Sequence, residues 1–227
     1  TIGWPLSALL LHEWDWRITC LIWAVSAAAR SCRGIINQFS GAASLAFFFA
    51  ATWFVQGAMA AHLPRLLQAA GASSTAAIVA AALVGPAQVG ARIIEFSLLR
   101  SFHPIASARL ASLLHPIGAV FLVVLGAPGI AAFALLHGAG NGMITIAKGT
   151  LPLALFGPQG YGLRSGLLSA PARVLQSAAP FLFGLLLDRV GIGAIGLSAG
   201  LCFAAFGSLF LVRPRRAARA SPAPIHG

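Results

Sequence analysis

Six long apolar runs constrain this chain more than any other feature of its sequence. Each is close to the roughly 20 residues that a helix needs to cross a bilayer core of about 30 Å. They cover residues 42–61, 75–94, 106–126, 129–148, 165–187 and 192–212. Two weaker runs, at 1–11 and 18–29, precede them. We therefore predict an all-α, polytopic transmembrane bundle with about six to eight spans.

The composition supports a membrane protein and disfavours other classes. Hydrophobic residues make up 59% of the chain and charged residues 8%, against roughly 25% charged residues in a soluble domain. A membrane β-barrel would show short alternating strands, whereas these runs are continuous. The three cysteines are scattered, which favours neither a disulfide framework nor a zinc site. The chain begins at Thr1 and shows no signal-peptide pattern, so we expect it to be part of something longer.

The net charge of +11 indicates membrane topology rather than nucleic-acid binding, because the basic residues lie mainly at the ends of the apolar runs and in the tail. Threading the chain back and forth places Arg17, Arg65 and Arg189 on one side. The other side collects Arg30, Arg33, Arg92, Arg100, Arg109, Lys148, Arg164, Arg213, Arg215, Arg216 and Arg219. The positive-inside rule makes this second side cytoplasmic. We expect the basic tail, residues 213–227, to be cytoplasmic and disordered.

Three patches of the sequence resemble the major facilitator superfamily (MFS) of secondary transporters. Gly3-Trp4-Pro5-Leu6 through Trp16-Arg17 resembles the end of the family's fifth helix and the turn into the sixth. Leu83 to Arg92 resembles the end of the eighth helix. Phe156 to Gly191, with Tyr161-Gly162, Pro180-Phe181 and Asp188-Arg189, resembles the loop and helix that lead to the twelfth. The sequence lacks the Asp and basic cluster of the family's gating motif after Arg92.

The resemblance implies a C-terminal portion of a transporter, covering about helices five to twelve. Residues 1–36 would be the end of the N-terminal helix bundle and the central loop, and 37–212 the C-terminal six-helix bundle. The implied location is the inner (plasma) membrane, as a multi-pass protein. The implied mechanism is alternating access, in which one half rocks against the other. The partners would be the lipid bilayer, a small-molecule substrate and the missing N-terminal half of the transporter.

Arg173 is the one charge in the run from Ser165 to Leu187. A cation inside a membrane is costly and by default functional, and a guanidinium suits an anionic group such as a carboxylate. Gln176 shares its helical face at i+3, so we predict both residues as substrate-binding. The alternative is that Arg173 snorkels or bonds to carbonyls of a neighbouring helix.

Three further residues are predicted to bind substrate. His137, Asn141 and Lys148 lie along one face of the run that matches the fourth helix of the C-terminal half, which lines the family's central cavity. Gln56 lies on the run that matches the first helix of that half. Asn141, Lys148 and Gln56 are therefore candidates. The alternatives are an interhelical hydrogen bond for Asn141 and a positive-inside anchor for Lys148.

Charged residues at the ends of the runs are candidates for gating. Arg92 and Glu95 stand at i, i+3, where an ion pair either holds an inward gate shut or solvates a helix end. Asp188 and Arg189 follow the run at its outer end. His115 precedes Pro116, and we expect it to bond locally rather than carry protons.

The sequence thus predicts secondary active transport of a small organic solute, with an anionic group expected from Arg173 and Lys148. The alternative is a truncated membrane protein or scaffold that transports nothing. The apolar runs carry no nucleophile–base pair, metal cluster or phosphate-binding loop, so we expect no enzyme activity, cofactor or metal.

Overall fold

The computed structural model describes residues 39–99 and 103–212, and all regular structure within them is helical. The residues before 39 and after 212, including the predicted first patch and basic tail, lie outside the described part. The α-helices are α3 (Phe39–Ala69), α4 (Ser74–Ala82), α5 (Val84–Ile94), α6 (Pro104–Leu125), α7 (Ile130–Phe156), α8 (Tyr161–Val190) and α9 (Ala194–Leu211). Glu95–Leu99 form a π-helical turn, and Ala127–Gly129 and Gly191–Gly193 form 3-10 turns.

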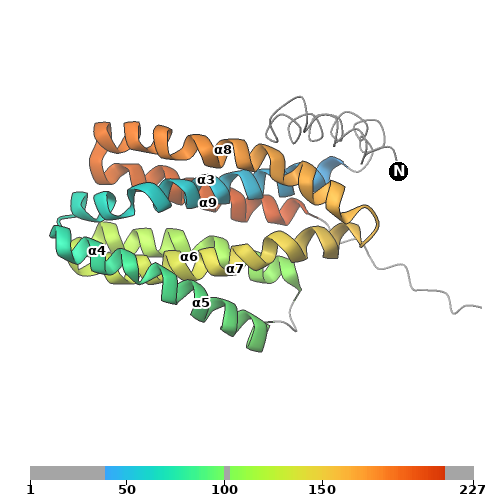
Figure 1. The fold of residues 1–227 in the computed structure, drawn as a ribbon, viewed down its shortest axis with the longest axis horizontal. Helices are drawn as coiled ribbons and strands as arrows, with labels where there is room; N and C mark the ends of the chain where they lie inside the picture. Colours follow the sequence, from blue (N-terminus) through green and yellow to red (C-terminus); the bar gives the residue numbers. More distant parts are fainter. Residues whose placement is uncertain (1–38, 100–102, 213–227) are drawn as a thin grey trace, which may run out of the picture.

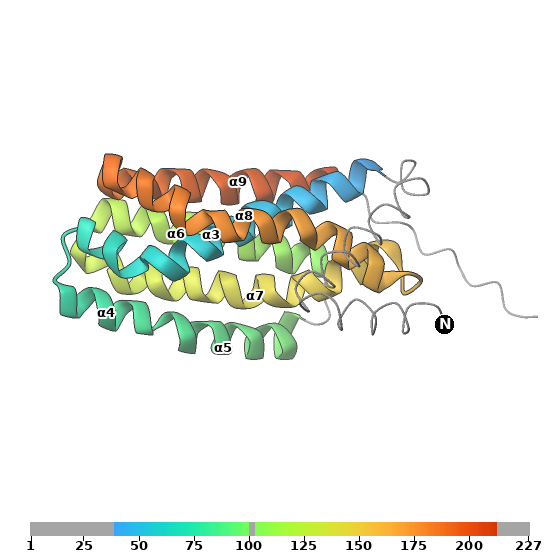
Figure 2. The ribbon, with the colours of Figure 1, turned by 45° about the horizontal axis from the view of Figure 1, so that its top comes forward.

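The helices lie side by side and reverse direction at each connection except that between α4 and α5, which follow one another in the same direction, as Figures 1 and 2 show for the part of the chain described. α3 packs against both α8 and α9, while α7 packs against α5 and α6. Short turns are sufficient because glycines end the helices: Gly126 and Gly191 have φ of 64° and 54°, a conformation that costs a glycine little. The result is an antiparallel bundle with a core between the helices.

Five segments of the described chain are long and apolar enough to cross a membrane: Gly41–Ala69, Ser74–Ser97, Pro104–Leu125, Ala127–Phe156 and Tyr161–Leu211. The last contains both α8 and α9. Large apolar side chains point outwards, such as Val124 and Phe181, which are 73% and 70% exposed. Such a surface suits lipid better than water. The prediction of an all-helical bundle is confirmed, and its long apolar helices fit a multi-pass membrane protein, while the location, the family and the number of spans stay predictions.

α3, α7 and α8 extend beyond the predicted runs, whereas α9 is slightly shorter than its run. α3 continues through Pro64 to Ala69, and α8 begins at Tyr161 rather than near Ser165. Arg173 consequently lies close to the middle of its helix. Proline has its strongest effect at Pro86, whose ring crowds the carbonyl of Ala82 and offers it no N–H. There α4 ends at Ala82 and α5 begins at Val84.

Glycines of α7 let neighbouring backbones come very close. A Cβ placed on Gly138 would lie 2.7 Å from the carbonyl oxygen of Val84, and one on Gly142 would lie 2.5 Å from that of Gln88, both on α5. Gly140 faces the other way, 2.8 Å from the carbonyl oxygen of Ala111 on α6. Small residues thus permit close contact between these helices, as they commonly do in membrane bundles. Asn141 and His137 are thereby held at a fixed place between helices.

α3 and α8 also meet closely at two levels. A Cβ on Gly57 would lie 2.7 Å from the carbonyl oxygen of Gln176. Four residues later along α8, Pro180 has no N–H to bond that oxygen. One level further, Nε2 of His62 lies 2.8 Å from the carbonyl oxygen of Pro180 and hydrogen-bonds to it. Two backbone carbonyls of α8 therefore set its position along α3.

The turn between α7 and α8 is fixed by side chains from α8. Arg164 donates from Nη1 to the carbonyl oxygen of Phe156 at 2.7 Å, and the Tyr161 hydroxyl donates to that of Gly149 at 3.1 Å. A cation beside the last carbonyls of a helix also opposes the helix dipole favourably. Arg109 does the same for α9 by donating to the carbonyl oxygen of Leu209 at 3.0 Å. Both arginines lie at the end of the bundle for which the positive-inside rule predicts a cytoplasmic location.

Candidate functional site

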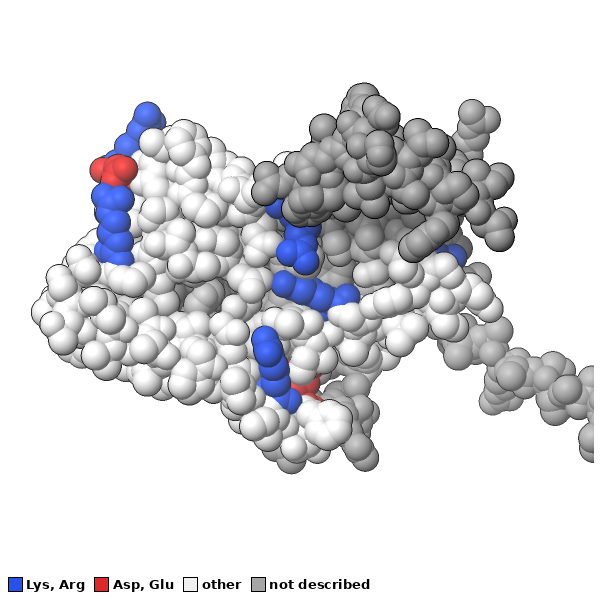
Figure 3. Space-filling view, in the orientation of Figure 1, with Lys and Arg blue, Asp and Glu red and all other residues white. Residues whose placement is uncertain are grey.

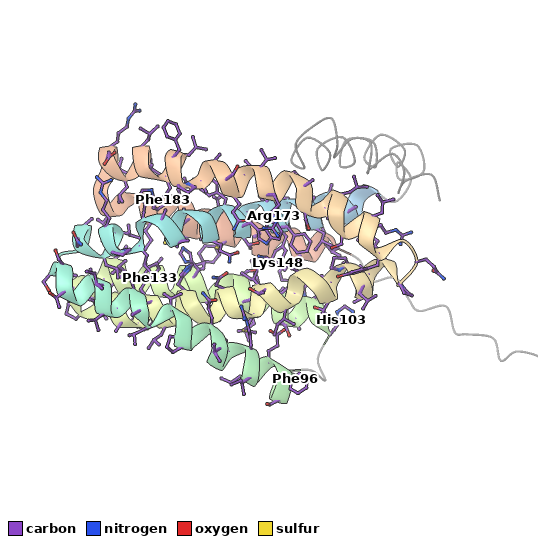
Figure 4. All side chains as sticks on the ribbon, viewed as in Figure 1. Phe96, His103, Phe133, Lys148, Arg173 and Phe183 are labelled. Atoms are coloured by element: carbon purple, nitrogen blue, oxygen red, sulfur yellow. The ribbon has the colours of Figure 1, made fainter. Side chains whose placement is uncertain are left out.

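The candidate site centres on Trp53, a residue of α3 that is only 4% exposed. Nζ of Lys148, from α7, lies 4.2 Å from the centre of its ring, and Cζ of Arg173, from α8, lies 4.5 Å from it. Both distances are within the range of a cation–π attraction, for which tryptophan is the best partner. Figure 4 shows Lys148 and Arg173 close to each other near the middle of the bundle's length. Three helices thus bring two cations onto one aromatic ring.

Gln56 joins the same site one turn along α3. Nζ of Lys148 donates a hydrogen bond to its Oε1 at 3.0 Å. Trp53 and Gln56 stand at i, i+3 and so share one helical face, which is why a single side chain of α7 contacts both. The predicted pair of Lys148 and Gln56 is brought together, with Lys148 half-buried and its amine directed into the bundle.

No acidic side chain of the described residues pairs with Lys148 or Arg173. The described chain holds two acids, Glu95 and Asp188. Asp188 forms an ion pair with Arg65, and Glu95 is buried at the end of α5. Figure 3 shows basic side chains at the middle of this face and acidic ones at two separate places. The two cations of the site are therefore uncompensated within the described chain.

The other two predicted substrate residues lie beside this centre. Asn141 lines a small pocket together with Gln56 and Thr52. The pocket has a volume of about 20 Å³, room for a single ordered water. Gln176 is half-buried on α8, with its Cγ facing Gly57 of α3. Of the five predicted residues, Lys148, Arg173 and Gln56 therefore meet around Trp53. Asn141 and Gln176 lie in the contacts between the adjoining helices.

Two buried histidines form the inner wall of that pocket. Nδ1 of His115 on α6 lies 2.9 Å from Nδ1 of His137 on α7, and Nε2 of His115 lies 2.9 Å from Oγ of Ser198 on α9. Oγ of Ser198 is also 2.9 Å from the carbonyl oxygen of Ile195 and donates its proton there. The expectation that His115 bonds locally is wrong, because its side chain hydrogen-bonds to residues of two other helices, while the expectation that it carries no protons stays a prediction.

The hydrogen-bond directions follow from the donors available. Since the Ser198 hydroxyl gives its one proton to Ile195, its oxygen accepts from Nε2 of His115. Neutral His115 then has a lone pair on Nδ1, which accepts from Nδ1 of His137. Phe133 packs against both rings, with centroids 5.4 Å and 5.9 Å away. A continuous series of hydrogen bonds between neutral groups thereby links α7, α6 and α9.

The predicted gating residues are dispersed. Asp188 pairs with Arg65, so this ion pair joins α8 to α3 of the same bundle, and Arg189 is exposed beside it. Arg92 is exposed on α5, while Glu95 is 8% exposed within the π-helical turn. Among the described residues no ion pair joins Arg92 to Glu95. Glu95 is buried while Arg92 is exposed, so the two side chains lie in different surroundings.

Sequence reasoning missed Trp53. It lies within the apolar stretch Phe47 to Val55, where an aromatic residue has the pattern of an ordinary core residue. The available signal was the combination of Trp53 with Gln56 one turn later, on the run already expected to line a cavity. The described residues contain no group of three or more His, Cys, Asp or Glu side chains placed to hold a metal ion.

No protein-family model matches the chain, and no curated protein matches it either.

Proposed function

We propose that this chain is the C-terminal portion of an MFS-type secondary transporter, with residues 37–212 as its six-helix bundle. The transporter moves a small organic anion by alternating access. The observation that carries the proposal is the placement of Lys148 and Arg173 on Trp53, at mid-depth of a bundle with membrane-length helices. The resemblance of the sequence patches to that family supports the transport mechanism. The bundle's face with Trp53 would line the solute path against the N-terminal half.

The energetics of a membrane favour an anion as the solute. A charged side chain at the centre of a spanning helix costs about 2.5–3.5 kcal/mol on insertion scales, so such residues are kept where they have a partner or a water-filled cavity. Here two cations share one site, and within the described residues their one hydrogen bond is from Lys148 to the neutral amide of Gln56. An anionic solute supplies the missing partner. Asn141 and Gln176 add neutral donors and acceptors at its edge.

The orientation proposed for the protein follows from the ends of the bundle. Arg109 and Arg164 cap helices at one end, and we place this end in the cytoplasm of a cell with the protein in its inner membrane. The C-terminal tail follows α9 from the same end and is cytoplasmic too. The opposite end carries the Arg65–Asp188 pair and Arg189.

The test uses the full-length gene product, purified and reconstituted into proteoliposomes. Exchange is measured with radiolabelled benzoate, succinate, citrate and glycerol 3-phosphate as probes. We expect exchange of at least one of these anions, reduced at least tenfold in Arg173→Gln and in Lys148→Gln. Gln68→Ala, which truncates an exposed polar side chain near the end of α3, is the matched control and keeps full exchange.

Two results would contradict the proposal. One is the absence of exchange for all four probes with a folded protein, which favours the alternative of a membrane scaffold that transports nothing. The other is exchange that persists unchanged in both site variants, because the cations on Trp53 would then have no part in it.

A further inference from the structure

We propose that the solute is a dianion, with one negative charge for each of the two cations on Trp53. This inference rests on the proposed function and adds the charge of the solute to it. Lys148 and Arg173 both lie within 4.5 Å of the centre of the same ring. A site that holds them so close has a formal charge of +2.

The described chain does not neutralise this charge. Of its two acids, Asp188 is bound to Arg65, and Glu95 is buried at the end of α5. Gln56 accepts a hydrogen bond from Lys148 but carries no charge. Two like charges near each other repel, and inside a membrane each is costly if left unpaired. A monoanion would relieve only one of them, whereas a dianion pairs with both.

The free hydrogen-bond donors match two anionic groups of different geometry. The ammonium of Lys148 has three N–H donors, and one is used on Gln56. The guanidinium of Arg173 is exposed and makes no hydrogen bond within the described residues. Its planar fork suits a carboxylate or phosphoryl group in a bidentate manner, while the ammonium acts as a point charge for a second group.

Trp53 explains how both cations stay available. A cation held by the face of a ring keeps its N–H groups free, whereas an ion pair with an acid would use them. The ring therefore concentrates positive charge without consuming donors. Dicarboxylates and phosphate monoesters share the required chemistry, so both classes are included in the experiment.

The experiment compares probes that differ by one charge and little else. Succinate and its monoamide, succinamate, have nearly the same shape, but succinamate carries one carboxylate. Each competes with the tracer found to exchange in proteoliposomes with the full-length protein, and glycerol 3-phosphate serves as the phosphoryl probe. We expect succinate or glycerol 3-phosphate to half-inhibit exchange at a concentration at least tenfold lower than succinamate does.

Lys148→Gln tests the charge count directly. With one cation left, the preference for succinate over succinamate should fall to about twofold or less, while succinamate still competes, which shows that the variant is folded. Lys148→Arg keeps the charge and should keep the preference. If glycerol 3-phosphate competes more strongly than succinate, its preference over succinamate should likewise fall to about twofold or less in Lys148→Gln.

The outcomes separate this inference from the proposed function. If no anion exchanges, the proposed function fails. If exchange occurs but succinamate competes as well as both dianions, transport stands and the dianion inference is wrong. A preference for dianions that survives unchanged in Lys148→Gln also overturns it.

Discussion

The Nδ1 atoms of His115 and His137 lie 2.9 Å apart, so a single proton bridges α6 and α7. The next bond in the chain, from His115 to Ser198, carries the connection to α9. All three side chains are buried, with His115 at 4% and His137 at 6% exposure. This buried hydrogen-bonded cluster therefore holds α6, α7 and α9 together at the inner wall of the pocket.

The histidine pair predicts a measurable coupling free energy. Replacing His115 by Phe, His137 by Phe, and both together forms a double-mutant cycle for the free energy of unfolding. Interhelical hydrogen bonds in membrane proteins average about 0.6 kcal/mol and reach about 1.7 kcal/mol. We expect a coupling in the upper part of that range, because each single variant also leaves a buried ring nitrogen without its partner. Additive single effects would show that the two rings do not share a proton.

The contact between α5 and α7 predicts that Gly142→Ala is destabilising. The new Cβ would lie 2.5 Å from the carbonyl oxygen of Gln88, and backbone cannot rotate away as a side chain can. Overpacking of this kind costs about 1–3 kcal/mol. Thermal unfolding of the purified protein in detergent measures the effect.

Gly166→Ala is the matched control for that variant. It lies on α8 with nothing within 4 Å of its Cβ position. There the higher helix propensity of alanine should stabilise by up to about 1 kcal/mol. Equal melting temperatures for the two variants would contradict the close approach of α5 and α7.

Trp53 predicts a graded loss of anion affinity. Trp53→Phe keeps an aromatic face under Lys148 and Arg173, while Trp53→Leu removes it. Two cation–π contacts are worth about 0.5–1 kcal/mol each. In Trp53→Leu, the concentration of the exchanged anion that half-inhibits tracer exchange should therefore rise roughly five- to thirtyfold. Trp53→Phe should fall between this variant and the unaltered protein. The same loss in both variants would assign the effect to core packing, so each variant's melting temperature is measured alongside.

The membrane topology predicts which end of the bundle reacts from outside the cell. In a variant with Cys20, Cys32 and Cys202 replaced, single cysteines are placed at Ser74, at the end with the Arg65–Asp188 pair, and at Gln159, at the opposite end. A membrane-impermeant maleimide should label Ser74→Cys in intact cells. It should label Gln159→Cys only after the membrane is opened. The reverse pattern would overturn the positive-inside assignment.

Hydropathy predicted where the helices lie but not where they end. Membrane-length apolar runs identify helices because a spanning backbone must bond within itself. The predicted runs are too short, because α3 continues past Pro64 and α8 already begins at Tyr161. Proline and glycine are tolerated inside α3 and α8 because neighbouring helices can satisfy the backbone groups that these residues leave free. The hydropathy of one segment does not show which helices will be its neighbours.

The polar residues of the site were predictable, and their partners were not. Lys148, Arg173 and Gln56 stand out because charges and amides are rare in such runs. Trp53 and the partners of His115 depend on how α3, α6, α7, α8 and α9 pack, with residues far apart in sequence. Helical periodicity orders residues around one helix, and it says nothing about which neighbour that face meets.

The close contacts of Gly57 with Gln176 and of His62 with Pro180 have a consequence for binding. They fix the register of α3 on α8 through backbone carbonyls, and this register also sets where Trp53 stands relative to Arg173. The spacing between ring and guanidinium is therefore decided when the helices pack, before any solute arrives. Such a preorganised site spends little of the solute's binding free energy on its own assembly, which leaves that free energy for discrimination between anions.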